Sequence, residues 1–225
     1  MIEEIYLNLS GIYDGFVSEI NLTNVSSTNC YCDDYAKKIL RDKLKDLTPE
    51  GLHFIDSGNY HYLSYFFLEK IKEDFALILI DHHPDYQPPS FGDILSCGGW
   101  VKTANDTLPH LKRVYMIEVD EGLYGQLKEV PENVCLLKKD EIGKIAKDLP
   151  IYISIDKDAL CEKDAATDWD QGDMKIEELM EVLHQLQHYK IIGIDVSGEK
   201  KEMPTDKEKI KNKKTNEFIR KSLDL

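Results

Sequence analysis

Asp81, His83 and Asp85 offer two carboxylates and an imidazole at a spacing of two residues. They directly follow Phe75–Ile80, an apolar run that is typical of a buried parallel strand. Since side chains alternate along an extended chain, the three would point to the same side. Oxygen and imidazole donors that converge at the carboxyl end of a strand suit a divalent metal ion. A polar loop that happens to contain histidine is the alternative interpretation.

A second acidic pair has the same spacing. Asp156 and Asp158 follow Pro150–Ile155, another strand candidate, and they would again share one face. Acidic residues are depleted in strand interiors, so a pair at a strand end needs a reason. A turn or a helix cap explains one aspartate more easily than both. This pair therefore strengthens the prediction of a metal site.

His61 completes the candidate set. It follows a short strand predicted at Leu52–Asp56, and Gly58 and Asn59 tolerate a turn that would bring the imidazole back over the strand end. A lone histidine is more often structural than functional. The prediction that His61 is a ligand therefore depends on the two aspartate-containing motifs.

Taken in order, the three motifs resemble those of the ureohydrolase family, which includes arginase, agmatinase and formimidoylglutamase. The matching segments are Gly58–His61, Asp81–Asp85 and Ser154–Asp158, and the resemblance spans the chain from about His53 to Glu199. It implies a site for two metal ions, usually manganese, in a protein that commonly assembles as a homo-oligomer. It also implies six protein ligands to these ions: His61, Asp81, His83, Asp85, Asp156 and Asp158.

The charges of these residues would balance two divalent ions. The four aspartates carry four negative charges, and both histidines would bind as neutral imidazoles. A bridging hydroxide would make the site negative again and so favour a small cationic substrate. Two metals about 3.5–4 Å apart can generate such a hydroxide at neutral pH, and its addition to a planar carbon would release an amine. Oxygen-rich ligation favours manganese, with zinc or iron(II) as alternatives.

Two departures from the family pattern concern catalysis rather than metal binding. Ureohydrolases usually carry a proton-shuttling histidine in a glycine-rich segment, but the corresponding Ser96–Trp100 contains none. The family also places a substrate-binding glutamate after the last core strand, where this chain has Gly198, with Glu199 one residue later. A bulge at Gly198 can turn Glu199 into the pocket. Glu199 and Asp85 are therefore the predicted catalytic residues.

Other polar groups near these motifs can relay a proton or hold a cation. His82, Asp168 and Asp170 are candidates for the relay, although His82 should face away from the site if the strand geometry persists. Trp169 lies between two acidic residues and can bind a cation through its ring face. The alternative is that it packs on the surface.

Strands that alternate with helices position these motifs. Seven strands are predicted, at Ile5–Leu9, His53–Ile55, Ala76–Ile80, Arg113–Val119, Val134–Leu137, Ile151–Ile155 and Ile191–Val196. Helical patterns lie between several of them. This alternation predicts an α/β fold, a three-layer α/β/α arrangement with a mostly parallel sheet of about seven or eight strands. Residues 1–225 are expected to form a single domain.

The predicted helices cover Asp33–Leu47, Tyr62–Lys72 and Met174–His188, and Asp173 can cap the last of these. Thr205 and Glu208 form a capping-box pattern at the start of a C-terminal helix in the segment Lys200–Leu225. The apolar residues expected to share the inner face of that helix are Ile210, Phe218, Ile219 and Leu223.

The composition excludes several classes of partner. A formal net charge of −14 argues against binding to nucleic acid or to anionic membranes. No stretch has the length of a membrane-spanning helix, and the N-terminus lacks the basic start of a signal peptide, so a cytoplasmic location is expected. The five cysteines do not resemble a secreted disulfide framework, and free thiols are expected. Cys30 and Cys32 could alternatively form a metal or redox pair.

These observations predict a metal-dependent hydrolase of linear, non-peptide C–N bonds. Its substrate would be a small guanidino, amidino or formimino compound, and a metal-bridging hydroxide would be the nucleophile. One alternative is an amide hydrolase of the deacetylase kind, which has a related architecture and a single zinc ion. Another is a metal-binding member of the family that has lost catalysis.

Overall fold

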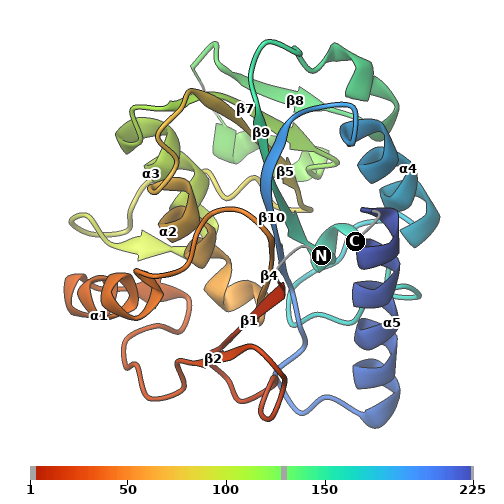
Figure 1. The fold of residues 1–225 in the computed structure, drawn as a ribbon. Helices are drawn as coiled ribbons and strands as arrows, with labels where there is room; N and C mark the ends of the chain where they lie inside the picture. Colours follow the sequence, from red (N-terminus) through yellow and green to blue (C-terminus); the bar gives the residue numbers. More distant parts are fainter. Residues whose placement is uncertain (1–3, 128–130, 224–225) are drawn as a thin grey trace.

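A parallel β-sheet of eight strands forms the centre of the protein in this computed structural model, which describes residues 4–127 and 131–223 (Figure 1). The strands are β1 Glu4–Asn8, β2 Glu19–Asn21, β4 Leu52–Ile55, β5 Phe75–Ile80, β7 Leu111–Ile117, β8 Val134–Leu137, β9 Ile151–Asp156 and β10 Ile191–Ser197. Their order across the sheet is β2-β1-β4-β10-β9-β5-β7-β8, with parallel pairing throughout. The predicted α/β architecture is confirmed.

The seven predicted strands agree with the observed ones to within two residues at each end. The sequence did not predict β2, because Glu19–Asn21 is short, polar and only partly buried at the edge of the sheet. It also missed a separate antiparallel pair formed by β3 (Tyr31–Cys32) and β6 (Leu95–Ser96). Strands of two or three residues carry too little periodicity to be recognised.

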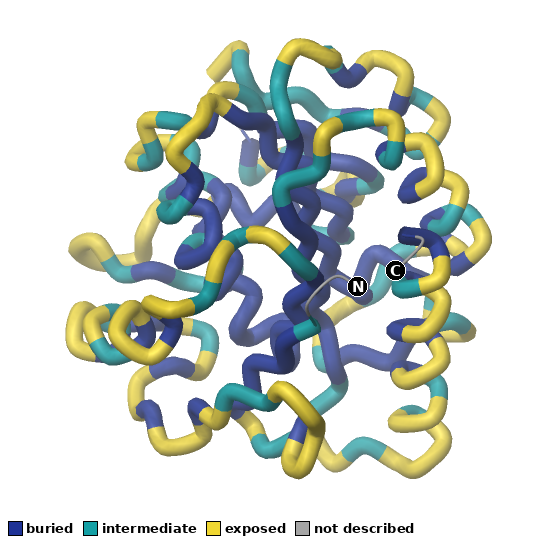
Figure 2. The backbone as a smooth tube through the Cα atoms, in the orientation of Figure 1, coloured by how far each residue is buried: buried dark blue, intermediate teal, exposed yellow. Residues whose placement is uncertain are grey.

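Helices cover both faces of the sheet, which buries the apolar central strands on both sides. The helices are α1 Asp34–Leu44, α2 Ser64–Leu68, α3 Trp100–Thr107, α4 Ile176–Leu186 and α5 Asp206–Ser222. Figure 1 shows α1, α2 and α3 on one side of the sheet and α4 and α5 on the other. In Figure 2 the strands are buried, whereas the helices alternate between buried and exposed residues.

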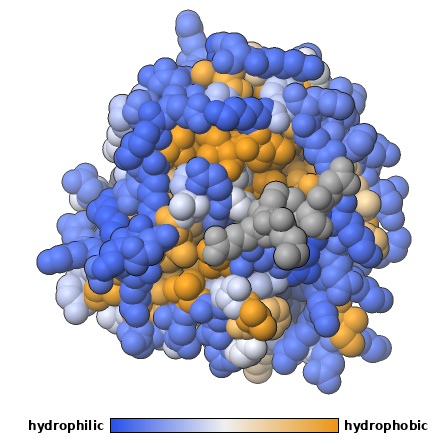
Figure 3. Space-filling model, in the orientation of Figure 1, coloured by the Kyte–Doolittle hydropathy of each residue, from blue (hydrophilic) through white to orange (hydrophobic). Residues whose placement is uncertain are grey.

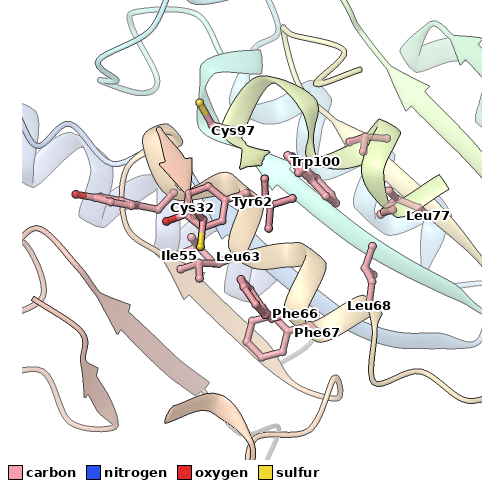
Figure 4. Close-up of a cluster of buried hydrophobic side chains, with 14 of the residues drawn as sticks. Cys32, Ile55, Tyr62, Leu63, Phe66, Phe67, Leu68, Leu77, Cys97 and Trp100 are labelled. Atoms are coloured by element: carbon pink, nitrogen blue, oxygen red, sulfur yellow. The ribbon is translucent and has the colours of Figure 1, made fainter. Parts of the chain in front are cut away.

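Alternate residues of β5 pack into the hydrophobic clusters on opposite faces of the sheet. Leu77 and Leu79 of β5 join the cluster that contains the buried side chains of α1, α2 and α3. Figure 4 shows part of this cluster. Ile78 and Ile80 join the cluster under α4 and α5. This period of two fixes the register of β5, so the residues that follow it leave the sheet at a defined place.

Two helix predictions need correction in detail. The predicted helix Tyr62–Lys72 is a 3₁₀ helix over Gly58–Leu63 followed by the short α2. Asp173 does not cap α4, whose N-cap is Lys175. A side chain that is distant in the sequence instead satisfies a backbone donor in the first turn of α4. The N–H of Ile176 donates to a carboxylate oxygen of Asp164 at 3.0 Å.

The C-terminal helix is α5, and the predicted capping box of Thr205 and Glu208 is present at its start. Its buried face differs from the predicted one. Ile219 and Leu223 are buried, but Ile210 and Phe218 are exposed. The other buried residues of α5 are polar, namely Asn212, Thr215, Asn216 and Ser222. Asp224 and Leu225 lie outside the described residues.

Most of the face shown in Figure 3 is hydrophilic, as expected for a chain with 31% charged residues. Among the described residues, no helix is both long enough and apolar enough to span a membrane.

Candidate metal centre

Neighbouring strands bring the aspartate motifs to the same edge of the sheet. Strands β5 and β9 are adjacent, with Ile80 opposite Ile155, so Asp81 and Asp156 follow at the same level. The carboxyl ends of parallel strands form the usual ligand-binding edge of such a sheet. The sheet thus places two of the predicted motifs side by side.

His61 reaches this edge from the 3₁₀ helix that follows β4. The hydroxyl of Ser57 accepts a hydrogen bond from the N–H of Asn59 and so completes the first turn of that helix. Gly58 permits a close approach, because a Cβ at this position would lie 3.0 Å from the Trp169 ring and 3.1 Å from Asp156 Oδ2. A larger residue would press on both groups, so glycine leaves room where the turn passes over the strand end.

One set of donor atoms surrounds Nδ1 of His61. This nitrogen lies 3.3 Å from Asp81 Oδ2, and His61, Asp81 and Asp156 offer ligand atoms close enough to hold one ion. It also lies 3.1 Å from Asp85 Oδ2 and 3.5 Å from Asp156 Oδ2. His61 and these carboxylates are buried. Their donor atoms therefore converge in the protein interior rather than in solvent.

A second set of donor atoms surrounds His83. Its Nδ1 lies 2.9 Å from Asp158 Oδ2 and 3.7 Å from Asp81 Oδ1. Asp81, His83 and Asp158 again offer ligand atoms close enough to hold an ion. Asp81 belongs to both sets, and it presents a different oxygen to each histidine. A carboxylate shared in this way is suited to bridge two metal ions.

The structure therefore brings all six predicted ligands into one cavity. The volume of the cavity is about 330 Å³. Asp81, Asp85, Asp156 and Asp158 all line it, but no lysine or arginine is found among the described lining residues. Four carboxylates outnumber the two imidazoles among the described lining residues, so the excess negative charge makes the cavity attractive to cations.

Burial and close neighbours shift the pKa values of the aspartates and histidines in the cavity. Burial raises the pKa of Asp156 to about 6, and the neighbouring Asp158 carboxylate adds to the effect. Burial and Asp81 raise the pKa of Asp158 to about 6. Burial lowers the proton affinity of His83, but its hydrogen bonds to Asp158 and Asp81 outweigh that effect and raise its pKa to about 11. Protons on the imidazoles thus offset part of the acidic charge, and divalent cations would compete with them.

Hydrogen bonds from the surrounding chain orient the carboxylates. The indole N–H of Trp100 donates to Asp85 Oδ2 at 2.7 Å. The backbone N–H of His83 donates to Asp81 Oδ1 at 2.6 Å, and that of Asp158 donates to Asp156 Oδ1 at 2.9 Å. Groups that fix predicted ligands in this way commonly tune metal affinity.

A buried polar chain orients His61 from behind. Its Nε2 lies 2.9 Å from the hydroxyl of Ser154, which donates to Asp195 Oδ1 at 2.6 Å. This contact directs the opposite nitrogen of the ring toward the aspartates. Burial raises the pKa of Asp195 to about 6. No role was predicted for Asp195, although an acidic residue inside an apolar strand is a usable signal in the sequence.

Comparisons with known proteins give information on the fold of the chain. No protein-family model matches the chain. A curated protein of Thermotoga maritima, described as uncharacterized, is 34% identical over 161 residues, which cover 70% of this chain and 62% of that protein. This chain thus spans less than two thirds of the length of that relative.

Solved structures of three enzymes superpose on the chain. Proclavaminate amidino hydrolase from Streptomyces clavuligerus gives a TM-score of 0.68 at 16% identity, covering 91% of this chain and 72% of that one. Agmatine ureohydrolase of Thermoplasma volcanium gives 0.65 at 14% identity, covering 85% and 68%. Arginase from Bacillus caldovelox gives 0.65 at 13% identity, covering 99% and 98%. The chain has the ureohydrolase-family fold. At these identities the similarity shows the fold alone.

Within the ureohydrolase-family fold, the strand end that precedes Glu199 has an unusual conformation. Gly198 has a φ of +91°, and a Cβ there would lie 2.3 Å from Asp156 Oδ1. A larger residue at this position would therefore collide with a predicted metal ligand. The side chain that follows, Glu199, does not line the metal cavity in the described structure.

Glu199 instead belongs to a separate buried cluster. Its Oε1 lies 2.6 Å from Nζ of Lys157, and it accepts hydrogen bonds from Tyr13, Asn212 and Asn216. Burial would raise the pKa of Glu199, but the Lys157 ammonium outweighs it and the pKa is lowered. The catalytic role predicted for Glu199 stays a prediction, and these contacts do not favour it.

Some of the other residues predicted to take part in catalysis or substrate binding line the cavity, and others lie outside it. Asp85 and Trp169 line the cavity, and the Trp169 indole N–H donates to Asn59 Oδ1 at 2.8 Å. His82 does not line it, as the alternation of side chains predicted. Asp168 accepts hydrogen bonds from the backbone N–H groups of Lys201 and Glu202, which is a structural role.

Proposed function

We propose that this protein is a metal-dependent hydrolase of linear, non-peptide C–N bonds that acts on a small guanidino, amidino or formimino compound. The observation that carries the proposal is the pair of donor sets that share Asp81 in a cavity lined by four aspartates. The enzymes whose fold the chain shares include an amidino hydrolase and an agmatine ureohydrolase, which supports the same class of reaction.

The donor set fits two divalent ions. His61, Asp81, Asp85 and Asp156 would hold one ion, and Asp81, His83 and Asp158 would hold the other. Carboxylate oxygens and imidazole nitrogens without a thiolate ligand favour manganese, with zinc or iron(II) as alternatives. Such a pair of ions, when bound, supplies an activated water molecule at neutral pH and neutralises negative charge that develops on the substrate.

The residues of the chain have distinct parts in this proposal. Asp85 lines the cavity beside His61, so its carboxylate is placed to exchange a proton with a water molecule there. The Trp100 indole holds that carboxylate in place. We infer that Asp85 takes a proton from the attacking water and returns it to the departing amine.

Substrate binding would depend on charge and on an aromatic wall. The described lining of the cavity has four carboxylates and no lysine or arginine, so it suits a guanidinium or amidinium group. Trp169 is 41% exposed and lies edge-on to the His83 ring, with 5.9 Å between the ring centres. A planar cation could lie against its free ring face.

A second function is favoured by two specific observations. Cys97 lies in the segment where the ureohydrolase pattern has a histidine, and Gly198 has no side chain where that pattern has a glutamate. A metal-binding protein that has lost catalysis would keep the donor sets and lack these groups. Such a protein would bind manganese and release nothing from the substrates above.

Elemental analysis after loading with Mn²⁺ and dialysis tests the metal site. We expect two ions per chain in the unaltered protein and a loss of at least one in Asp81→Asn, because Asp81 belongs to both donor sets. Asp93→Asn is the matched control, since Asp93 is exposed and lies outside the cavity. One tightly held zinc ion would favour the deacetylase-like alternative. Equal and negligible metal in all three proteins would refute the metal site.

A substrate screen separates hydrolase from binding protein. The Mn²⁺-loaded protein would be incubated with guanidino, amidino and formimino compounds, and released urea, ammonia or formamide would be measured. Acetylated amines form the comparison set for the deacetylase-like reaction. We expect release only from the first group and none from Asp81→Asn. Two bound ions without release from any compound would support the non-catalytic function.

A further inference from the structure

Two cysteines face each other beside the candidate metal centre. In the antiparallel pair of β3 and β6, Tyr31 is opposite Ser96 and Cys32 is opposite Leu95. Cys30 immediately precedes β3, with a left-handed φ of +61°, and Cys97 immediately follows β6. The backbone pairing still continues to these two residues, because the N–H of Cys97 donates to the carbonyl of Cys30 at 2.9 Å. Opposed residues of an antiparallel pair have Cα atoms about 4.5–5.5 Å apart, which is within the range that a disulfide spans.

The two thiols also interact and are accessible from the same cavity. Both residues line the cavity of the candidate metal centre, where a small molecule can reach them. A hydrogen bond from the Cys97 thiol lowers the pKa of Cys30 to about 7, and the same contact and burial raise that of Cys97. This contact therefore favours the thiolate form of Cys30, which is the nucleophilic form of a cysteine.

We propose that Cys30 and Cys97 form a thiol–disulfide exchange site that reacts with small-molecule disulfides at the rim of the candidate metal centre. The Cys30 thiolate attacks one sulfur of the small disulfide, and a mixed disulfide forms while one small thiolate leaves. The Cys97 sulfur, as it gives up its proton, then attacks the sulfur of Cys30. The second small thiol leaves, so the protein loses two electrons and the small disulfide gains them.

The other cysteines lack this combination of features. Cys32 is fully buried, and burial raises its pKa to about 12, so it is a poor nucleophile. Cys135 and Cys161 are partly exposed, but neither lies opposite another cysteine in the described sheet pairings. These three thiols therefore serve as internal controls for reactivity that depends on the pair.

The test is disulfide mapping on the full-length protein. The reduced protein is incubated with excess oxidised glutathione at pH 7.5, remaining thiols are alkylated, and peptides are identified by mass spectrometry. We expect a Cys30–Cys97 linkage, a decrease from five free thiols to three, and full recovery with dithiothreitol. In Cys97→Ser, Cys30 should stop at the mixed disulfide with glutathione. Cys161→Ser, the matched control, should form the linkage as the unaltered protein does.

Several results would overturn the proposal. They are five thiols that stay free, a mixed disulfide at Cys30 that persists in the unaltered protein, and a linkage that joins Cys30 to Cys32. The readout requires no hydrolase activity, so a failed substrate screen and a failed disulfide test are separate outcomes. Because the unaltered protein gives the decisive result, poor folding of a variant cannot obscure it.

Discussion

Three consecutive residues at the end of β9 belong to two different kinds of charged cluster. Asp156 and Asp158 line the candidate metal cavity, whereas Lys157 between them turns the other way and pairs with Glu199. All three are buried. Asp156 is the last residue of β9, and Lys157–Ala159 form a 3₁₀ turn. The turn at the strand end therefore divides one acidic–basic–acidic run between two environments.

The two clusters differ in how far their charges are compensated. Around Glu199, one ammonium group and three neutral donors satisfy one carboxylate, so the cluster needs nothing from outside. Around Asp156, four carboxylates share two imidazoles, and the described lining adds no basic side chain. A buried cluster whose charges balance needs no further ion, whereas one with excess negative charge attracts a cation. Substitutions in either cluster can test this difference.

The largest expected effect is on stability, in Lys157→Met. Removing the ammonium leaves the Glu199 carboxylate buried without its charge partner, and this typically costs about 3–5 kcal/mol. The free energy of unfolding from urea denaturation measures the loss. In Lys157→Met/Glu199→Gln the charge is removed together with its partner, and at least half of the stability should return. Equal stability of the single and double variants would contradict the role assigned to this pair.

Asp156→Asn should increase the stability of the metal-free protein, whereas Lys157→Met decreases it. Because burial raises the pKa of Asp156 to about 6, its ionised form destabilises the fold at pH values above 6. At pH 8 the neutral asparagine should therefore stabilise the protein by about 1–3 kcal/mol. This gain should shrink as the pH falls from 8 to 4.5, where the aspartate of the unaltered protein becomes protonated. Urea denaturation at both pH values, in the presence of a chelator, tests this; a variant less stable than the unaltered protein at pH 8 would refute it.

Trp100→Phe should weaken metal binding without removing a predicted ligand. It deletes the indole N–H that holds Asp85 Oδ2 and should lower Mn²⁺ affinity about tenfold, as measured by calorimetric titration. The matched control is Trp169→Phe, which removes the hydrogen bond to Asn59 and leaves every predicted ligand with its partners. Similar affinities in the two variants would show that the Trp100 contact does not orient the site.

The smallest expected effect is that of Asn216→Ala. It removes one of several hydrogen bonds to Glu199 and should cost about 1–2 kcal/mol of unfolding free energy. The Mn²⁺ content should stay at the level of the unaltered protein, because Asn216 does not line the metal cavity. A loss of metal in this variant would mean that the two clusters are coupled rather than independent.

The sequence predicted the strands well because each long strand has its own apolar run. Phe75–Ile80 and Ile151–Asp156 are buried throughout, and their ends carry the acidic motifs at the predicted places. The prediction was poorer for α5, where apolar Ile210 is exposed and polar Asn216 is buried. Its inner face is selected by hydrogen bonding to Glu199, and hydrophobic periodicity does not report such a partner.

The direction of the Glu199 side chain also could not be predicted from the local sequence. Its place after the last strand suggested a catalytic position, but its direction depends on the left-handed turn at Gly198 and on donors from Tyr13, Asn212 and Lys157. These donors come from segments far apart in the chain. No local pattern around residue 199 contains that information.

By itself, the sequence determined the α/β class and the places where the strands end, because these follow from local periodicity. Beyond those ends the chain is no longer extended, since Asp85 has a φ of +46° and Asp158 lies in a 3₁₀ turn, so periodicity did not fix where these aspartates project. Only the tertiary structure decided that β5 and β9 lie side by side, that Asp81 is shared between two donor sets, and that Lys157 and Glu199 are paired elsewhere. The physical reason is that periodicity fixes the direction of a side chain relative to its own strand. Which other groups it meets depends on strand order and on contacts between distant segments.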